Sequence, residues 1–319
     1  MAVATRVDPK DFFGPDEWAP LAARSSWKGL ALVVHAWLVI GATWAVVIWS
    51  PHLLGVFWPV TIIPAAMIIG ARQLGLAILM HDAAHSCLHP NLKANDWIAE
   101  WVCGGDVERY RKYHLQHHKF AQQAEDPDLG LSAPFPITRS SLGRKVVRDL
   151  TGQTWFKQRF GLLQAKLKAR KAGEPVLPIL GGEIHRQRRW LIQNGVVIIA
   201  TSALGYWWAW FALWLLPRAT WFQLVTRFRN IAEHALIAKD EPDPLRHART
   251  TRAGFVERAL IAPYYVNYHC EHHMFMHMPC WSLPRAHRLL QAKGVMDRMR
   301  TAPGYWTVLS QAAGKPAGA

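Results

Sequence analysis

The sequence is poor in cysteine and in acidic residues, and each shortage limits the classes of protein to which it can belong. Only four cysteines occur in 319 residues, and no two of them form a CxxC pair. A thiolate zinc site and a disulfide framework are therefore excluded as the basis of the fold. We interpret the cysteines as reduced residues of structural or incidental character, at Cys87, Cys103, Cys270 and Cys280.

The shortage of acidic residues leaves a formal net charge of +15, with 22 Asp and Glu against 37 Lys and Arg. Nucleic-acid binding is the obvious reading of such a charge. However, no helix-turn-helix, zinc-finger spacing or basic–aromatic RNA motif accompanies it. The basic residues instead avoid the apolar parts of the chain, as expected for cytoplasmic loops that face anionic lipid headgroups. We therefore predict no nucleic-acid partner.

Charged residues are scarce within three long apolar runs, at 27–50, 53–80 and 190–225. Each run is long enough to cross a bilayer at least once. The positive-inside rule places segments rich in lysine and arginine in the cytoplasm. The N-terminus is therefore predicted to be cytosolic, together with residues 81–189 and 230–319.

Histidine, by contrast, is abundant, and nine of the sixteen histidines stand in clusters that read HDAAH, HLQHH, NIAEH and HCEHH. On a helix, offsets of three or four residues place side chains on one face. Histidine is also the commonest metal ligand among side chains. The pattern predicts metal ligands at His81, His85, His114, His117, His118, His234, His269, His272 and His273.

Nine imidazole ligands are more than a single metal ion can coordinate. Structural zinc prefers four ligands that usually include cysteine, catalytic zinc keeps three plus water, and no HExxH motif is present. Two metal ions, each with four or five nitrogens and an open position, match the count better, and non-haem iron held in this way can bind and reduce O2. Acidic neighbours could accept the second imidazole N–H and orient each ring, namely Asp82, Glu125, Asp126, Asp128, Glu233 and Glu271.

The seven other histidines are interpreted more simply. Two lie on apolar helices and are expected to be hydrogen-bonded core residues, three lie in basic loops and are expected to be solvated, and two lie beside clusters as candidate ligands or ligand neighbours. In that order they are His35 and His52, then His185, His247 and His287, then His89 and His277.

The histidine clusters must reach the same metals, and this requirement constrains the membrane topology. The chain has to cross the bilayer an even number of times between the second and third clusters. Two spans fit the run at 190–225, although Pro217-Arg218 lies awkwardly within the second, because a charge in the bilayer is costly. We predict four transmembrane helices in two hairpins, at about 27–50, 53–80, 190–206 and 207–229.

The three histidine boxes, their order, the hydrophobic hairpins and the Asn-x-x-x-His after the last span resemble the integral-membrane fatty acid desaturase and hydroxylase superfamily, over roughly residues 30–290. The resemblance implies that His234 is the extra histidine of the last span and that Asn230 holds one iron through water. It implies an all-α integral membrane fold, with four transmembrane helices capped by a cytosolic helical domain that holds two iron ions, Fe2+ or Fe3+. Residues 1–319 would form this single domain.

Two departures refine the resemblance. The first box is HxxxH, which is more similar to acyl-lipid desaturases, ketolases and hydroxylases than to the acyl-CoA Δ9 enzymes. The third box begins with His269 where front-end desaturases have glutamine. No HPGG haem motif is fused to the chain, so electrons are expected from a separate protein such as a ferredoxin or a cytochrome-type donor. The protein is expected to be multi-pass in the plasma (inner) membrane, with the boxes and both termini in the cytoplasm.

The resemblance implies an oxidoreductase that reduces O2 at a di-iron centre and abstracts hydrogen from an unactivated C–H bond. The leading hypothesis is a fatty acid (acyl-lipid) desaturase that introduces a double bond into a lipid acyl chain. The alternative is a di-iron hydroxylase or ketolase acting on a carotenoid, an alkane or a related lipid. A metal transporter with cytosolic histidine sensors is a third hypothesis, but the ionisable residues that it would need within its spans are nearly absent.

Overall fold

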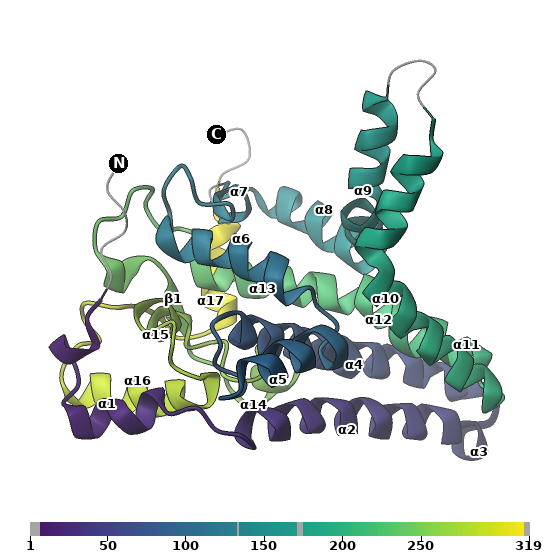
Figure 1. Cartoon of the computed structure of the whole chain (residues 1–319), viewed down its shortest axis with the longest axis horizontal. Helices are drawn as coiled ribbons and strands as arrows, with labels where there is room; N and C mark the ends of the chain where they lie inside the picture. The colour runs from purple at the N-terminus through teal and green to yellow at the C-terminus, as the bar shows by residue number, and fades with distance from the viewer. Residues whose placement is uncertain (1–6, 133, 171–174, 316–319) are drawn as a thin grey trace.

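The computed structural model describes residues 7–132, 134–170 and 175–315, and these residues are mostly helical, as the sequence predicts (Figure 1). The two strands have three residues each and pair in parallel, with Arg249 opposite Arg300. From the N-terminus to the middle of the chain, the elements are η1 (Pro9–Asp11), α1 (Pro15–Ala22), α2 (Lys28–Trp49), α3 (Pro51–Leu54), η2 (Gly55–Thr61), α4 (Ile62–Ala84), α5 (Leu92–Trp97), η3 (Ile98–Val102), α6 (Val107–Lys119), α7 (Leu129–Ser132), α8 (Arg139–Leu150) and α9 (Gln153–Ala169).

The second half of the chain carries the longest helix and the two short strands. After α9 the elements are α10 (Leu177–Ala203), α11 (Trp207–Trp210), η4 (Phe211–Leu215), α12 (Leu216–Ala219), α13 (Trp221–His234), η5 (Pro244–Arg246), β1 (Arg249–Thr251), α14 (Phe255–Leu260), α15 (His269–Met274), η6 (Cys280–Ser282), α16 (Leu283–Ala292), β2 (Arg300–Ala302) and α17 (Tyr305–Ala312). Of the short segments, η3 and η4 are π-helical turns, and η1, η2, η5 and η6 are 3-10 turns.

Helices α2 and α4 form an antiparallel hairpin along one side of the molecule (Figure 1). The buried face of α2 repeats at helical spacing through Val33, Ala36 and Ile40, which is the pattern of a stripe packed against a neighbour. Gly29 lies at the start of this contact, where a Cβ atom would come 2.1 Å from the Leu88 carbonyl oxygen. Only glycine therefore allows this close approach.

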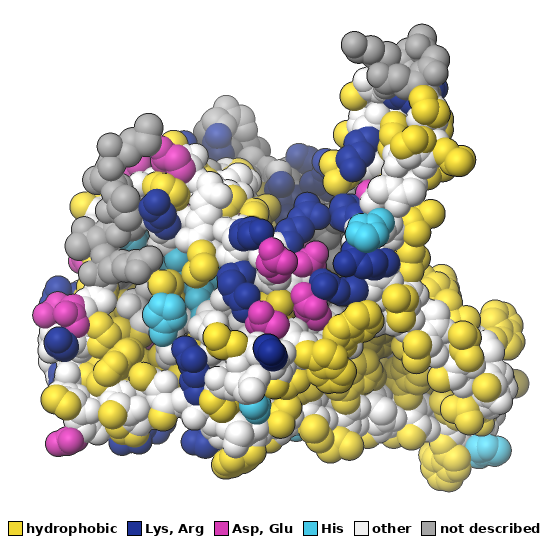
Figure 2. Space-filling view, in the orientation of Figure 1, with side chains coloured by type: hydrophobic (Ala, Val, Ile, Leu, Met, Phe, Trp, Pro, Cys, Tyr) yellow, Lys and Arg dark blue, Asp and Glu magenta, His cyan; other side chains and the backbone are white. Residues whose placement is uncertain are grey.

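The hairpin Lys28–Ala84 is the one helical stretch among the described residues that is long and apolar enough to cross a bilayer, with a mean hydropathy of 2.2. Only 22% of its most apolar window is buried inside the protein. Large side chains such as Leu38, Val46 and Trp49 are exposed instead. An apolar surface of this extent is unusual on a water-soluble protein. Figure 2 shows that it continues around this end of the molecule.

The second predicted hairpin differs from the sequence-based expectation. The helix expected at 190–206 begins much earlier, at Leu177, and ends at Ala203. The continuous helix expected at 207–229 is interrupted, because the chain leaves helical geometry at Thr220, where φ is −117° and ψ is −87°, and α13 begins a new helix there. Proline lacks an N–H donor and is best tolerated in the first turn of a helix, and Pro217 stands in the first turn of α12. The number of membrane crossings stays a prediction.

The second hairpin is tied to the first by polar contacts to π-helical carbonyl groups. The indole N–H of Trp44 donates to the Leu213 carbonyl at 3.0 Å, and the Gln73 amide donates to the Trp214 carbonyl at 2.9 Å. Helix α13 then packs beside α4, α8 and α17. Helix α9 and the first half of α10 project from the body as an antiparallel pair (Figure 1). This arrangement brings the C-terminal ends of α4 and α13 to the side of the molecule that holds α6 and α15.

Candidate metal centre

Four helices deliver the nine clustered histidines to one interior region. Helix α4 ends at Ala84 and presents His81 in its last turn, with His85 as its C-cap. Helix α13 ends at His234. Helix α6 carries the second cluster, and its N-terminus is capped by Asp106, whose carboxylate accepts from the Arg109 N–H at 3.2 Å. Helix α15 consists almost entirely of the third box.

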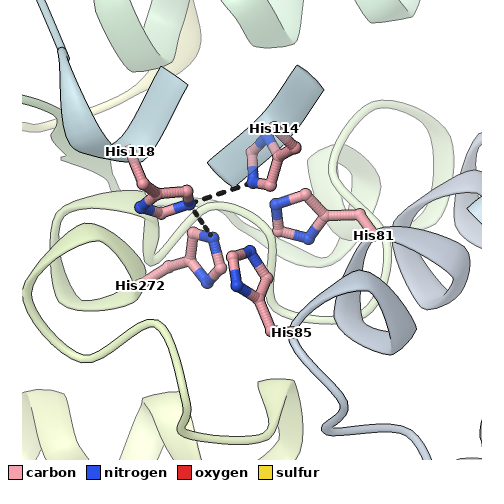
Figure 3. A group of neighbouring side chains, drawn as sticks. All are labelled: His81, His85, His114, His118 and His272. Atoms are coloured by element: carbon pink, nitrogen blue, oxygen red, sulfur yellow. Dashed lines mark hydrogen bonds between the residues drawn. The ribbon is translucent and has the colours of Figure 1, made fainter. Parts of the chain in front are cut away.

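Five of the histidines point their rings at a common centre (Figure 3). Their ligand nitrogens all lie within 4.8 Å of one another. The Nε2 atom of His118 is 2.9 Å from Nε2 of His114 and 3.1 Å from Nε2 of His272. This first group comes from α4, α6 and α15 and consists of His81, His85, His114, His118 and His272.

The other four histidines form a second group next to the first. The Nε2 atoms of His117 and His273 are 3.3 Å apart, and those of His234 and His269 are 2.9 Å apart. The ligand nitrogens of His117, His234 and His273 lie within 4.8 Å of one another. This second group comes from α6, α13 and α15.

The two groups are in direct contact. The rings of His118 and His273, one from each group, are stacked with their centroids 4.3 Å apart. Each HxxHH box therefore divides its residues between the groups. In the second box His117 separates from its neighbours, and in the third box His272 separates from His269 and His273.

The chemistry of the donor set fits two metal ions. Two imidazole nitrogens bound side by side to one ion at about 2.1 Å lie about 3 Å apart, which matches the separations within both groups. Nε2 of His81 and both ring nitrogens of His85 are buried without a hydrogen-bond partner among the described residues. Leaving such atoms unsatisfied costs about 1–3 kcal/mol each. A bound cation would remove this cost for the one nitrogen of each ring that faces it.

The protonation state of these rings also favours metal binding, because only a neutral imidazole has a lone pair to donate. Burial is the largest cause that lowers the pKa of the ligand histidines outside the apolar hairpins, and the charges of neighbouring imidazoles lower it further. The histidines shifted in this way are His114, His118, His234, His269, His272 and His273.

Buried carboxylates orient part of the second group, as the sequence predicts. Nδ1 of His117 donates to the Asp126 carboxylate at 2.8 Å, which leaves Nε2 free for a metal. Asp126 is itself held in place, because it accepts from the backbone N–H groups of Gln122 at 3.0 Å and Asp128 at 2.8 Å. The Asp128 carboxylate stands farther away, at 3.8 Å from the same ring nitrogen.

The Glu233 carboxylate lies beside a metal-facing nitrogen. A carboxylate that only orients an imidazole would instead accept from the other ring nitrogen. The Glu233 carboxylate is 3.5 Å from Nε2 of His269, the same nitrogen that faces His234. These three side chains form a further set that could hold a metal ion. Arg229, one turn earlier on α13, donates to both carboxylate oxygens at 2.7 Å. Burial raises the pKa of Glu233 to about 7, and Arg229 opposes this rise.

Two of the remaining acidic neighbours have other partners, and for Glu125 only the backbone carbonyl accepts a hydrogen bond among the described residues, from the Gln116 amide at 3.2 Å. Asp82 accepts from the Cys280 N–H at 3.3 Å. Glu271 accepts from the Thr250 hydroxyl and from His287. For these two residues the expectation of a hydrogen bond to a clustered imidazole is wrong.

Asn230 lies on the same helix as His234, one turn earlier. It lines a cavity of about 220 Å3 between α7, α8, α9 and α13, together with Gln223, Thr226 and Arg227. The fold brings nine of the ten residues expected at the metal site into two groups by their nitrogen atoms. For these nine histidines and for Asn230 the role as metal ligands stays a prediction.

Several isolated histidines differ from their expected settings. His35 and His52 are exposed on the apolar hairpin, although His35 lies 3.0 Å from the Tyr264 hydroxyl. His247 was expected to be solvated but is buried, and its ring contacts the Glu241 carbonyl at 2.7 Å. His287 has Glu271 as its partner. For His247 and His287 the expectation of solvated side chains is wrong, because tertiary packing covers them. For His35 and His52 the expected core position is wrong, because both side chains lie on the outer surface of the hairpin.

Three other histidines lie outside the two metal groups. His185 is exposed, as expected, but on α10 and not in a loop. His89 accepts from the Asn91 N–H at 3.0 Å, and His277 is exposed.

Two residues at the centre were not singled out by the sequence. The ring of Tyr110 is stacked on His114, with centroids 5.2 Å apart and an angle of 9° between the planes. Arg229 neutralises Glu233 as described above. Both stand four residues from a partner on the same helix, and this spacing is the signal that could have identified them.

Comparisons with known proteins agree with this geometry. The sequence model described as fatty acid desaturase matches residues 57–303. Dihydrorhizobitoxine desaturase from Bradyrhizobium elkanii is 26% identical over 243 residues, which cover 70% of this chain. The match covers 66% of that relative, so the chain spans just under two thirds of its length.

Two carotenoid enzymes are also similar. The beta-carotene ketolase of Paracoccus sp. strain PC1 is 28% identical over 68% of this chain and 75% of its own length. The beta-carotene ketolase of Paracoccus sp. strain N81106 is 26% identical over 80% of this chain and 86% of its own length. With the family match covering most of the residues and all nine clustered histidines, the chain belongs to the fatty acid desaturase family.

Proposed function

We propose that the protein is a membrane-bound oxidoreductase that uses O2 and two iron ions to introduce a double bond into a lipid acyl chain. The observation that carries this proposal is the pair of adjacent all-histidine groups, one with five members and one with four. Nine neutral nitrogen ligands without a thiolate suit iron that must change its oxidation state. The contact between the rings of His118 and His273 would keep two bound ions near each other, as joint action on one O2 molecule requires.

When bound, the iron pair supplies the redox chemistry that reduces O2 and breaks an unactivated C–H bond. The residues of the chain would position the metal ligands and limit their contact with water. Asp126 fixes the tautomer of His117. Glu233 neutralises Arg229 and stands ready as an oxygen ligand beside His269. Seven of the nine ligand histidines are buried, which limits the access of bulk water to the site.

An external electron donor is part of this proposal. A cavity of about 150 Å3 has His118 and His273 in its wall, together with Trp18, Met274 and Phe275. A small redox protein docked over this cavity would be close to one ligand from each metal group. The excess of basic residues in the chain favours an acidic partner of the ferredoxin or cytochrome type.

A second function has specific support. Two of the three relatives described above are named beta-carotene ketolases. The same histidine groups serve either outcome, because loss of a second hydrogen gives a double bond whereas insertion of oxygen gives an alcohol. A second insertion at the same carbon, followed by loss of water, gives a ketone. The alternative proposal is therefore oxygenation of a carotenoid or another extended lipid.

The product distinguishes the two functions. We expect lipid extracts from a host that expresses the protein with a donor system to contain a new acyl species lighter by two hydrogens. Mass spectrometry of total fatty acids and of added beta-carotene measures this directly. A host that expresses the protein with His272→Gln is the matched control. A carotenoid that gains oxygen while the fatty acids stay unchanged would replace the desaturase proposal with the ketolase proposal.

We further propose four membrane crossings, in the plasma (inner) membrane, with the histidines and both termini in the cytoplasm. The long apolar hairpin α2–α4 supports the first two crossings. The exposed apolar side chains Ile192, Val196 and Ile199 of α10 support the third crossing, and Trp207 and Phe211, exposed after the turn at Gly205, support the fourth. The distribution of basic residues gives the orientation.

Labelling of single introduced cysteines tests this topology. A membrane-impermeant thiol reagent added to intact cells is expected to modify His52→Cys at the tip of the first hairpin. It should spare Lys93→Cys, Lys157→Cys and Lys239→Cys until the membrane is opened, and all four positions are exposed in the structure. The chain without an introduced cysteine gives the background from its four native cysteines. Labelling of Lys93→Cys and Lys239→Cys from opposite sides would contradict an even number of crossings between them.

A further inference from the structure

Six arginines and one aspartate line a cavity of about 170 Å3 that is separate from the metal centre. The cavity lies where the foot of the α9–α10 projection meets the body, and it is edged by Gly104 and Gly105 after η3. Figure 2 shows lysine and arginine side chains gathered at this level, directly beside the broad apolar surface. The lining arginines come from four separate segments, namely Arg109 on α6, Arg159 on α9, Arg186, Arg188 and Arg189 on α10, and Arg218 on α12.

The positive charge of this cavity is only partly compensated. Arg189 pairs with Glu100 at 3.0 Å and lies 3.7 Å from Asp106, the one carboxylate in the lining, and Arg186 pairs with Glu183. The other four arginines have no carboxylate partner among the described residues, in contrast to Arg227 and Arg229, which do. Like charges held close together need an anion between them or lose favourable solvation. For these four arginines the described residues supply no ion-pair partner.

Two of the unpaired arginines are held in a geometry that suits phosphate. The guanidinium of Arg218 stacks on Phe222, 3.7 Å from the ring centroid, and that of Arg159 stacks on Trp190 at 4.2 Å. Stacking engages the flat face of a guanidinium and leaves its in-plane N–H groups free for bidentate binding of an oxyanion. One N–H group of Arg159 is used, by the Gln187 amide oxygen at 3.0 Å.

Burial, with the charge of Arg186 as a second cause, lowers the pKa of Arg159 to about 10. The lowered pKa indicates that the surroundings destabilise the charged form of Arg159. A bound anion would stabilise that charged form. The direction is opposite to that of Arg186, whose pKa is raised by its hydrogen bond to Glu183.

The residues around the cavity indicate which kind of molecule would supply the anion. A small recess of about 40 Å3 shares Gly104, Trp190 and Arg218 with the arginine cavity, and Leu76 and Trp214 line it on the side of the hairpins. On α10 the exposed apolar residues Leu191 and Ile192 directly follow the arginines, as Ile184 precedes them. A ligand in this place would have its charged end among the arginines and its apolar end beside the hairpins.

From this juxtaposition we infer that the arginine cavity binds the phosphate group of an anionic membrane lipid at the cytoplasmic surface of the bilayer. The inference rests on the proposed embedding of the hairpins in a membrane. It does not depend on iron or on the reaction catalysed. Arg159 and Arg218 are its main phosphate ligands, and Arg109 and Arg188 add charge at the rim.

Lipid titration of the full-length protein in a non-ionic detergent tests the inference. The probes are dioleoylphosphatidylglycerol, dioleoylglycerol with the same tails but no phosphate, and inorganic phosphate. We expect saturable binding of the phosphatidylglycerol and little binding of the dioleoylglycerol. The double variant Arg159→Gln with Arg218→Gln should weaken phosphatidylglycerol binding by at least tenfold. The doubly conservative Arg159→Lys with Arg218→Lys should recover part of it.

The control variant Arg139→Gln removes an exposed arginine outside the cavity and should bind as the native protein does. Native mass spectrometry of each variant reports bound lipid, and thermal unfolding confirms that it is folded. Equal affinity of the native protein and the double glutamine variant would overturn the inference. Tight binding of inorganic phosphate that displaces phosphatidylglycerol would also overturn it, because the occupant would then be a free anion. Because iron content and product formation play no part in these measurements, a failure of the proposed reaction leaves their outcome unaffected.

Discussion

Replacing His272 with glutamine is expected to abolish product formation and to remove most of the bound iron. His272 belongs to the group of five, and its Nε2 faces that of His118 at 3.1 Å. Loss of a partner that only orients a ligand already costs about 10–100-fold in metal affinity, so loss of a ligand nitrogen should cost at least as much. Glutamine keeps most of the volume of the side chain, so packing against the neighbouring rings is largely retained.

The measurement is iron per chain on purified protein, together with product formation on the same sample. The native protein should carry two irons and little zinc. His185→Gln is the matched control, because His185 is exposed on α10 and lies outside both groups. Full iron content in His272→Gln, or one zinc and no iron in the native protein, would contradict the di-iron proposal. Equal damage from His185→Gln would show that the histidines act through stability alone.

Replacing Asn230 with alanine is expected to reduce turnover strongly while leaving most of the iron in place. A neutral amide is a weak ligand, but it can hold a water molecule that binds a metal, and Asn230 stands one turn before His234. If it acts in this way, turnover per iron-loaded molecule should fall by about 10–100-fold, the range seen for residues that support a metal ligand. The direct histidine ligands remain, so iron should be retained.

A structural role for Asn230 predicts a different result. Loss of a hydrogen bond near a helix end would lower stability by about 1 kcal/mol and leave turnover per folded molecule unchanged. Thr226→Val is the matched control, because Thr226 lines the same cavity one turn earlier and valine has nearly the same shape. Iron content, turnover and the midpoint of thermal unfolding, measured on both variants, separate the two roles. Unchanged turnover in Asn230→Ala would remove Asn230 from the proposed site.

Much of the candidate site could be predicted because short spacings along a helix fix which side chains share a face. His114 and His118, four residues apart on α6, do enter the same group. Spacing alone could not assign His117 to the other group, because that depends on where α13 and α15 meet α6. It also could not place Glu233 beside His269, since these residues lie on different helices.

The fold was predictable to a similar extent. The apolar runs that form α2 and α4 were expected as a hairpin, and the structure has one that is long and apolar enough to cross a bilayer. The run that begins at residue 190 was ambiguous, since it contains both Pro217 and a basic residue. Its division at Thr220 follows from the packing of α13 against α4 and α8, which periodicity does not encode.

The sequence by itself determined the donor set and the class of the protein, because the identity and spacing of nine histidines and the length of the apolar runs are local properties. The tertiary structure alone decided how the histidines divide into groups of five and four. It also decided which isolated histidines are covered, as at His247 and His287, and it brought arginines from α6, α9, α10 and α12 around one cavity. The physical reason is the same for the division of the histidines, the covering of isolated histidines and the arginine cavity. Local periodicity fixes the direction of a side chain relative to its own helix, whereas the distance between side chains on different helices is set only when those helices pack.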